Sequence, residues 1–176
     1  MTYEEMFKEV AEKYGLRWEL LAEQAYRESR MDPNAVGAAD DMGLMQIIPS
    51  TWQEWAPKVG ARDPFDAYEN LTVAAAYLAY LRDYFQELGY PEYYWTLVAY
   101  NWGPGNLRRH LESGLGWNDL PEERRNYALS IILGSQARAL GQLGVEEGAR
   151  GLGEAPAEPA EPGDDAEFRR LLARPV

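Results

Sequence analysis

The stretch AYRESRMDPNAVGAADDMGLMQIIPSTW, residues 25–52, places an acidic side chain where a helix is expected to end. In and just before this stretch, Leu21, Ala25 and Glu28 are spaced i, i+4 and i+7, so they share one helical face. Two of the three are apolar, and Pro33 indicates that the helix stops soon afterwards. The pattern predicts that Glu28 points toward the protein interior. Burial of a carboxylate there costs free energy unless it is paired or its pKa rises.

The composition of the chain is typical of one globular domain. Its 176 residues are 46% hydrophobic and include six Trp and twelve Tyr, enough for a sizeable core. Nearly all the aromatic residues precede residue 128, so we expect the folded part to end near residue 140. The prediction is a folded domain over 1–144 and an acidic Pro/Ala/Glu-rich tail over 145–176, flexible or partner-binding.

Charge and residue usage exclude several classes of function. The net charge of −12 argues against nucleic-acid binding, because a phosphate backbone is met with Lys and Arg. No apolar run is long enough to span a membrane. The chain has no Cys, and its single histidine, His110, makes a multi-histidine metal centre impossible. We expect His110 to be an ordinary surface or half-buried residue, and the sequence implies no metal or organic cofactor.

A helical pattern runs through almost the whole chain, and the predicted fold class is mainly α. Thr2 with Glu5 forms a capping box for a first helix that Gly15 ends. The one competing signal is GLMQII, residues 43–48, which is either a short strand or a buried turn. Further helices are expected at about residues 17–28, 91–102, 105–113 and 121–140. Two more have capping signals: one is capped by Ser50 with Gln53 and stopped by Pro57, and the longest is capped by Asp66 with Glu69 and ended by Gly89.

Local sequence leaves two interpretations of Glu28 open. The first is a helix-end glutamate paired with Arg27 or Arg30, although those neighbours point to other faces of the helix. The second is a carboxylic acid that an apolar site keeps protonated near neutrality, as a general acid requires.

Two further stretches offer polar groups beside apolar ones. In GLMQ, Met45 is typical core filler, whereas the amide of Gln46 needs hydrogen-bond partners that a sugar or peptide could supply. In AYNWGPG, Tyr100, Asn101 and Trp102 stand just ahead of a tight turn. They are either a plain helix C-terminus or a set of hydrogen-bonding and stacking groups suited to a carbohydrate.

Five motifs occur in one order and together resemble a known family. RES is followed, eighteen residues after its Glu, by the Gln of GLMQ, and then come DPFDAYENLTVAAAYLAYL, AYNWGPGNLRRH and PEERRNYALSII. Over about residues 15–133 this set resembles the lytic transglycosylases of the soluble, goose-lysozyme-like type. Each motif alone is weak, but the combination is highly specific.

The resemblance implies a lysozyme-like helical domain with a substrate cleft that cleaves the β-1,4 bond between N-acetylmuramic acid and N-acetylglucosamine in peptidoglycan. Glu28 corresponds to the catalytic acid and base of that family, in which the C6 hydroxyl of the muramic residue attacks C1 and leaves a 1,6-anhydro end. Ordinary glycosidases need two carboxylates; intramolecular attack, with the N-acetyl group stabilising charge at C1, makes the second unnecessary. Asn70 corresponds to a structural position. The resemblance assigns substrate binding to Met45, Gln46, Ile48, Tyr100, Asn101, Glu123 and Tyr127.

The chain departs from the family pattern in three places. Many members have a serine that contacts substrate in the turn before GLMQ, whereas this chain reads GAADD with Gly37 in that position. Asp40 and Asp41 are additional acids in the same turn. They are either solvated turn residues, or one of them activates water and the enzyme is a hydrolysing goose-type muramidase. Trp102 replaces the usual small residue after AYN and is either a stacking wall or core.

The biological setting has two candidates. A chain with its own Met1, no secretory signal and a Pro/Glu tail suggests a phage virion component that opens the host wall. Its tail is a candidate contact for other virion or wall-complex proteins. The alternative is a periplasmic or secreted bacterial enzyme whose signal has been removed. Either would act outside the cytoplasm on peptidoglycan strands. A virion structural or wall-binding module with weak activity is the remaining non-enzymatic class.

Overall fold

The structure is a computed structural model that describes residues 1–143, and this part of the chain is helical. Its elements are, in order, α1 (Tyr3–Tyr14), α2 (Trp18–Ser29), α3 (Pro49–Val59), α4 (Ala67–Glu87), α5 (Tyr93–Trp102), α6 (Pro104–Glu112), the 3-10 helix η1 (Trp117–Asp119) and α7 (Glu122–Leu143). No strand occurs among residues 1–143, where isolated bridges join Met42 to Val36 and to Ile47. The GLMQII segment is therefore the buried turn of the two alternatives, and the mainly α prediction is confirmed.

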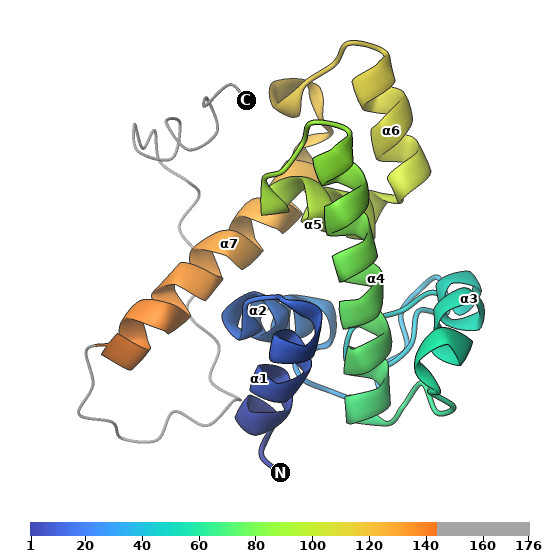
Figure 1. Cartoon of the computed structure of the whole chain (residues 1–176), viewed down its shortest axis with the longest axis vertical. Coiled ribbons are helices and arrows are strands. Elements are labelled where there is room, and N and C mark those ends of the chain that lie inside the picture. Colours follow the sequence, from blue (N-terminus) through green and yellow to red (C-terminus); the bar gives the residue numbers. More distant parts are fainter. Residues whose placement is uncertain (144–176) are drawn as a thin grey trace.

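The long helix α4, which runs through the middle of the domain in Figure 1, contributes residues to two clusters of buried side chains. The first core cluster joins α1, α2, residues 44–47, α3 and the N-terminal half of α4. The second core cluster joins the end of α4 to α5, α6 and α7, with Leu20 of α2. Tyr77 and Tyr100 pack against both clusters, so they lie where the two meet. Helix α7 starts beside α5 and runs back along α2, which places α2 against both halves of the domain (Figure 1).

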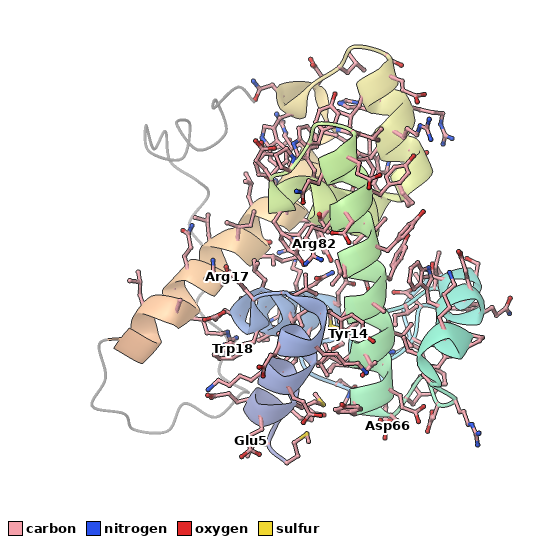
Figure 2. The ribbon with its side chains drawn as sticks, viewed as in Figure 1. Glu5, Tyr14, Arg17, Trp18, Asp66 and Arg82 are labelled. Atoms are coloured by element: carbon pink, nitrogen blue, oxygen red, sulfur yellow. The ribbon has the colours of Figure 1, made fainter. Side chains whose placement is uncertain are left out.

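Local signals in the sequence fix the starts of α1 and α4. The predicted capping box of α1 is present, with the Glu5 amide N–H donating to Thr2 Oγ1 over 3.1 Å and the Thr2 N–H to Glu5 Oε2 over 2.7 Å. The side chain of Asp66 caps α4 by accepting from the Glu69 N–H (2.9 Å). In Figure 2, Glu5 and Asp66 lie at the first turns of these two helices. Arg82 of α4 then ties the two helices together, donating to the Tyr14 carbonyl (3.2 Å) where α1 ends.

The predicted boundaries of α3 are wrong at both ends. The helix begins at Pro49, with Ile48 as its N-cap and no side-chain cap, so Ser50 lies inside the first turn. Pro57 does not stop the helix, which continues to Val59 and ends at Gly60 in the left-handed region (φ 73°). A proline near a C-terminus removes only one helical hydrogen bond, and the two residues after it need no further turn.

The tail prediction, residues 145–176, lies outside the described residues, and so does the exact boundary at 144. None of the helices within residues 1–143 is both long and apolar enough to cross a membrane.

Candidate active site

Glu28 lies in the last turn of α2, on the face that the sequence predicted. Leu21 and Ala25 of that face are fully buried, while Glu28 itself is half-buried. The helix ends directly after it, because Arg30 adopts a left-handed conformation (φ 55°). Ser29 then fixes the next segment against the helix end, donating to the carbonyl of Leu44 (2.7 Å).

Tyr127 of α7 is the direct partner of Glu28. Its hydroxyl donates to Glu28 Oε1 over 2.5 Å. The same hydroxyl accepts a hydrogen bond from Nε2 of Gln24 (3.1 Å), one turn earlier on α2. Both Tyr127 and Gln24 are buried, so the contact between α2 and α7 places a neutral donor on one carboxyl oxygen. Sequence analysis missed Gln24; its only signal is an amide four residues before Glu28 on an otherwise apolar face.

The surroundings of Glu28 keep its carboxyl group partly protonated at neutral pH. Burial raises the pKa of Glu28 to about 7; the hydrogen bond from Tyr127 and the charge of Arg27 act in the opposite direction, and the charge of Asp41 adds to the rise. Burial also raises the pKa of Tyr127 well above its ordinary value, so its hydroxyl stays a donor. A carboxyl group with a pKa near the working pH can both give and take a proton.

The ion-pair interpretation of Glu28 is not supported. Neither Arg27 nor Arg30 forms a salt bridge with it among the described residues. The guanidinium of Arg30 lies over the ring of Tyr26 instead, 4.8 Å from its centroid.

Asn70 of α4 holds the loop that faces Glu28. This fully buried amide donates from Nδ2 to the carbonyls of Met42 and Pro64 (both 2.9 Å), and its Oδ1 accepts from the Met45 N–H (2.8 Å). The structural role expected for Asn70 is confirmed. Gly43 makes this close approach possible, because a Cβ there would come within 2.3 Å of the Pro64 carbonyl oxygen, and its φ is +76°.

The predicted binding residues of the loop have different exposures. The side chain of Met45 is fully buried in the first core cluster. Gln46 is half-buried, and its Nε2 donates to the carbonyls of Ala35 (3.1 Å) and Gly43 (2.9 Å), so the loop itself supplies partners for the amide. Ile48 is 45% exposed and free to contact a ligand.

The residues at the end of α5 are tied to the loop and to α7. The Tyr100 hydroxyl donates to the Met45 carbonyl (2.8 Å), which brings α5 against the loop beside Glu28. Oδ1 of Asn101 accepts from Arg124 Nη1 (2.7 Å), a partner that sequence analysis missed. Glu123 is exposed and lies 3.5 Å from Arg124; within residues 1–143 it makes no hydrogen bond to Glu28 or Tyr100.

Trp102 and His110 take part in the packing of the second half of the domain. Trp102 packs against the second core cluster and meets His110 edge to face, with ring centroids 5.6 Å apart, so the core interpretation of Trp102 is favoured. His110 is buried and its Nε2 lies 2.8 Å from the carbonyl oxygen of Gly116, which makes it more buried than expected. Among residues 1–143 no cluster of three or more His, Asp or Glu side chains could hold a metal ion.

Comparison with known proteins agrees with this geometry. The model of the transglycosylase SLT domain matches residues 5–115, which is more than half of the chain. The chain belongs to this family. It is 37% identical over 129 residues to the membrane-bound lytic murein transglycosylase F of Maricaulis maris, covering 68% of this chain and 27% of that protein. The chain thus spans about a quarter of the length of that relative.

Two solved structures share the fold. An inactive Glu-to-Gln mutant of the lytic transglycosylase Slt from Pseudomonas aeruginosa superposes with a TM-score of 0.64 at 21% identity, covering 77% of this chain and 23% of that one. The 70-kDa soluble lytic transglycosylase from Escherichia coli gives 0.62 at 22% identity, with 76% and 23% covered. The family match confirms the predicted family, and these two structures confirm the predicted lysozyme-like helical fold.

Proposed function

We propose that this chain is a peptidoglycan lytic transglycosylase with Glu28 as its general acid and base. Its place in the SLT domain family supports the class of reaction. The observation that carries the residue assignment is the half-buried carboxyl of Glu28, with a pKa of about 7 and a neutral phenol on one oxygen. The similar Slt structure is of a glutamate-to-glutamine mutant that is inactive, which agrees with a single essential carboxyl group.

In the first step, protonated Glu28 gives its proton to the oxygen of the β-1,4 bond between N-acetylmuramic acid and N-acetylglucosamine. Because the Tyr127 hydroxyl bonds Oε1, the other carboxyl oxygen is the one to deliver the proton. The C1–O4 bond breaks, and the acetamido group of the muramic residue stabilises the positive charge at C1. The carboxylate that remains keeps the hydrogen bond from Tyr127, which stabilises it.

In the second step the Glu28 carboxylate takes the proton of the C6 hydroxyl as O6 bonds to C1. The product is a 1,6-anhydro end, no water is consumed, and Glu28 returns to its protonated form. One carboxyl group therefore acts first as acid and then as base, which needs a pKa close to the working pH. The second carboxylate of an ordinary glycosidase is not required, because the C6 hydroxyl of the substrate attacks C1 and Glu28 itself takes up its proton.

The predicted binding residues divide into two roles in this proposal. Ile48 and the half-buried Gln46 and Asn101 are the side chains left to contact the sugar. Met45 and Tyr100 act indirectly, because one is core and the hydroxyl of the other is bonded to the Met45 carbonyl. Glu123 is exposed, so its contact would be with an outer part of the substrate.

A hydrolysing muramidase is the second candidate, and Asp41 favours it. This half-buried acid is close enough for its charge to raise the pKa of Glu28, and a second carboxylate is what activation of water requires. The two enzymes differ by one water in their products.

Digestion of purified sacculi tests the proposal. Wild-type protein should release muropeptides with 1,6-anhydro ends, read by mass spectrometry as one water lighter than reducing ends. Glu28→Gln should abolish lysis, while Glu12→Gln, an exposed glutamate of α1, should leave it intact. Equal lysis by wild type and Glu28→Gln would reject the acid role, and reducing ends would establish the muramidase. Absence of lysis by wild type would indicate a wall-binding or virion structural module.

We propose a bacterial cell-wall setting outside the cytoplasm, with glycan strands of peptidoglycan as the substrate. Its support is that the relatives named above are bacterial proteins, one of them membrane-bound. No comparison supports the virion setting expected from the sequence. A contact of the tail with other wall or virion proteins stays a prediction.

A further inference from the structure

The side chain of Asp41 occupies the place that a side chain at position 37 would take. A Cβ built on Gly37 would lie 2.1 Å from Oδ2 and 2.3 Å from Oδ1 of Asp41. These distances leave no room for any side chain beyond hydrogen while the Asp41 carboxylate stays where it is, so its present position requires a glycine at position 37. Here an acid from four residues further on fills the same space.

The turn holds this carboxylate in place. The Gly37 N–H donates to the Asp41 carbonyl (2.8 Å), and the Asp40 N–H donates to the Gly37 carbonyl (3.1 Å). On the side chain, Oδ1 accepts from the Ala39 N–H (3.1 Å). Within the part of the chain that the structure describes, Oδ2 has no hydrogen-bond partner, and Asp41 is only half-buried. One carboxylate oxygen is therefore positioned and available as an acceptor.

The turn is joined to the residues around Glu28. Ser29 bonds the Leu44 carbonyl, and Tyr100 bonds the Met45 carbonyl, so α2 and α5 hold the loop from two sides. Burial is the main cause of the raised pKa values of Glu28 and Tyr100, and the charge of Asp41 adds a smaller rise to each. The groups that shift the pKa of Glu28 are Tyr127 of α7, Asp41 of the turn and Arg27 of α2. Tyr100 of α5 is a further neighbour, since the charge of Glu28 contributes to its raised pKa.

We propose that Asp41 is a substrate-contacting residue: its Oδ2 accepts a hydrogen bond from an O–H or amide N–H of the N-acetylated sugar whose linkage Glu28 protonates. A fixed negative charge beside the sugar also stabilises the positive charge that develops at C1. Asp41 acts here as an acceptor and a charge, and it takes up no proton. The inference rests on the proposed function of Glu28.

The test compares Asp41→Asn with Asp40→Asn in the sacculus assay. Both variants remove one charge from the same turn, but Asp40 is exposed and is not among the groups that shift the pKa of Glu28. Loss of a hydrogen bond to a charged acceptor predicts a fall in kcat/KM of about ten- to a hundredfold for Asp41→Asn. Its product should keep the 1,6-anhydro end. The alkaline limb of its pH profile should move to lower pH, because Glu28 must be protonated to act and loses a neighbour that raises its pKa. Asp40→Asn should match wild type.

Gly37→Ala is a second, independent test, because the added Cβ displaces the Asp41 carboxylate without removing an acidic residue. It should lower kcat/KM as Asp41→Asn does, and thermal unfolding shows whether each variant is folded. If Asp41→Asn and Gly37→Ala both match Asp40→Asn, the inference is wrong. It is also wrong if wild type yields reducing ends that Asp41→Asn abolishes, because Asp41 would then be a base for water. Equal lysis by wild type and Glu28→Gln would instead refute the proposed function, so the two failures are distinguishable.

Discussion

Replacing Tyr127 by Phe isolates what one hydroxyl does to the catalytic carboxyl group. The hydroxyl donates to Glu28 Oε1 over 2.5 Å and stabilises the ionised form, so its removal must raise the pKa of Glu28 above about 7. A hydrogen bond to a charged group contributes about 1.5–3 kcal/mol and one pKa unit equals about 1.4 kcal/mol, so the rise is about one to two units at most. The variant also leaves Gln24 Nε2 without the acceptor it has now, which should cost about 1–3 kcal/mol of stability.

The assay is kcat/KM for release of muropeptides from sacculi as a function of pH. Because Glu28 acts as an acid only when protonated, the alkaline limb of Tyr127→Phe should move to higher pH, opposite to the shift expected for Asp41→Asn. Tyr14→Phe is the matched control: Tyr14 is half-buried on α1, and its hydroxyl makes no hydrogen bond within residues 1–143. An unchanged limb, or one displaced to lower pH, would refute the assignment of Tyr127 as the donor that holds down the pKa of Glu28.

Three further substitutions test the loop and the buried acid. Asn70→Ala removes three hydrogen bonds of 2.8–2.9 Å and should lower the free energy of unfolding in urea by about 2–4 kcal/mol, with loss of lysis. Gly43→Ala should be less stable in thermal unfolding than Gly60→Ala: both glycines have positive φ, but only Gly43 faces a backbone oxygen, 2.3 Å from the new Cβ. Glu28→Gln should stabilise the fold by up to about 3 kcal/mol at pH 8 and hardly at all near pH 4. The pKa of Glu28 is raised from 4.5 to about 7, so the cost of its buried charge is absent below pH 4.5 and complete above about pH 7; equal stabilisation at both pH values would contradict this.

Local chemistry made part of this structure predictable. Thr2 and Glu5 form the expected capping box, because both partners lie within one turn and need nothing from the rest of the fold. The buried face of α2, and with it the direction of Glu28, followed from a spacing of four and seven residues. Pro57 misled the prediction, because a proline close to a helix end does not interrupt enough hydrogen bonds to decide where the helix stops.

Other parts of the site depend on contacts between distant segments. The amide of Gln46 was expected to need hydrogen-bond partners, which a sugar or peptide could supply. The loop turns at the positive φ of Gln46 (51°) and presents its own carbonyls to the amide nitrogen. Gln24 and Arg124 gave no usable signal, because each becomes meaningful only when α7 lies against α2 and α5. The sequence also does not reveal that the Asp41 carboxylate fills the space that a side chain at position 37 would occupy.

The close packing of α2 on α7 links the stability of the fold to the acidity of Glu28. Gly134 of α7 leaves the space for Glu23 of α2, since a Cβ there would come within 2.4 Å of Glu23 Oε2, and Arg138 pairs with the same carboxylate at 2.7 Å. This contact lies on the same two helices as the hydrogen bond from Tyr127 to Glu28. Glu23 is buried with a charged partner, so its position is tightly restricted. We therefore expect that a change in the packing of these two helices, such as a side chain at position 134, alters how well the Tyr127 hydroxyl reaches the Glu28 carboxyl group and with it the pKa of Glu28.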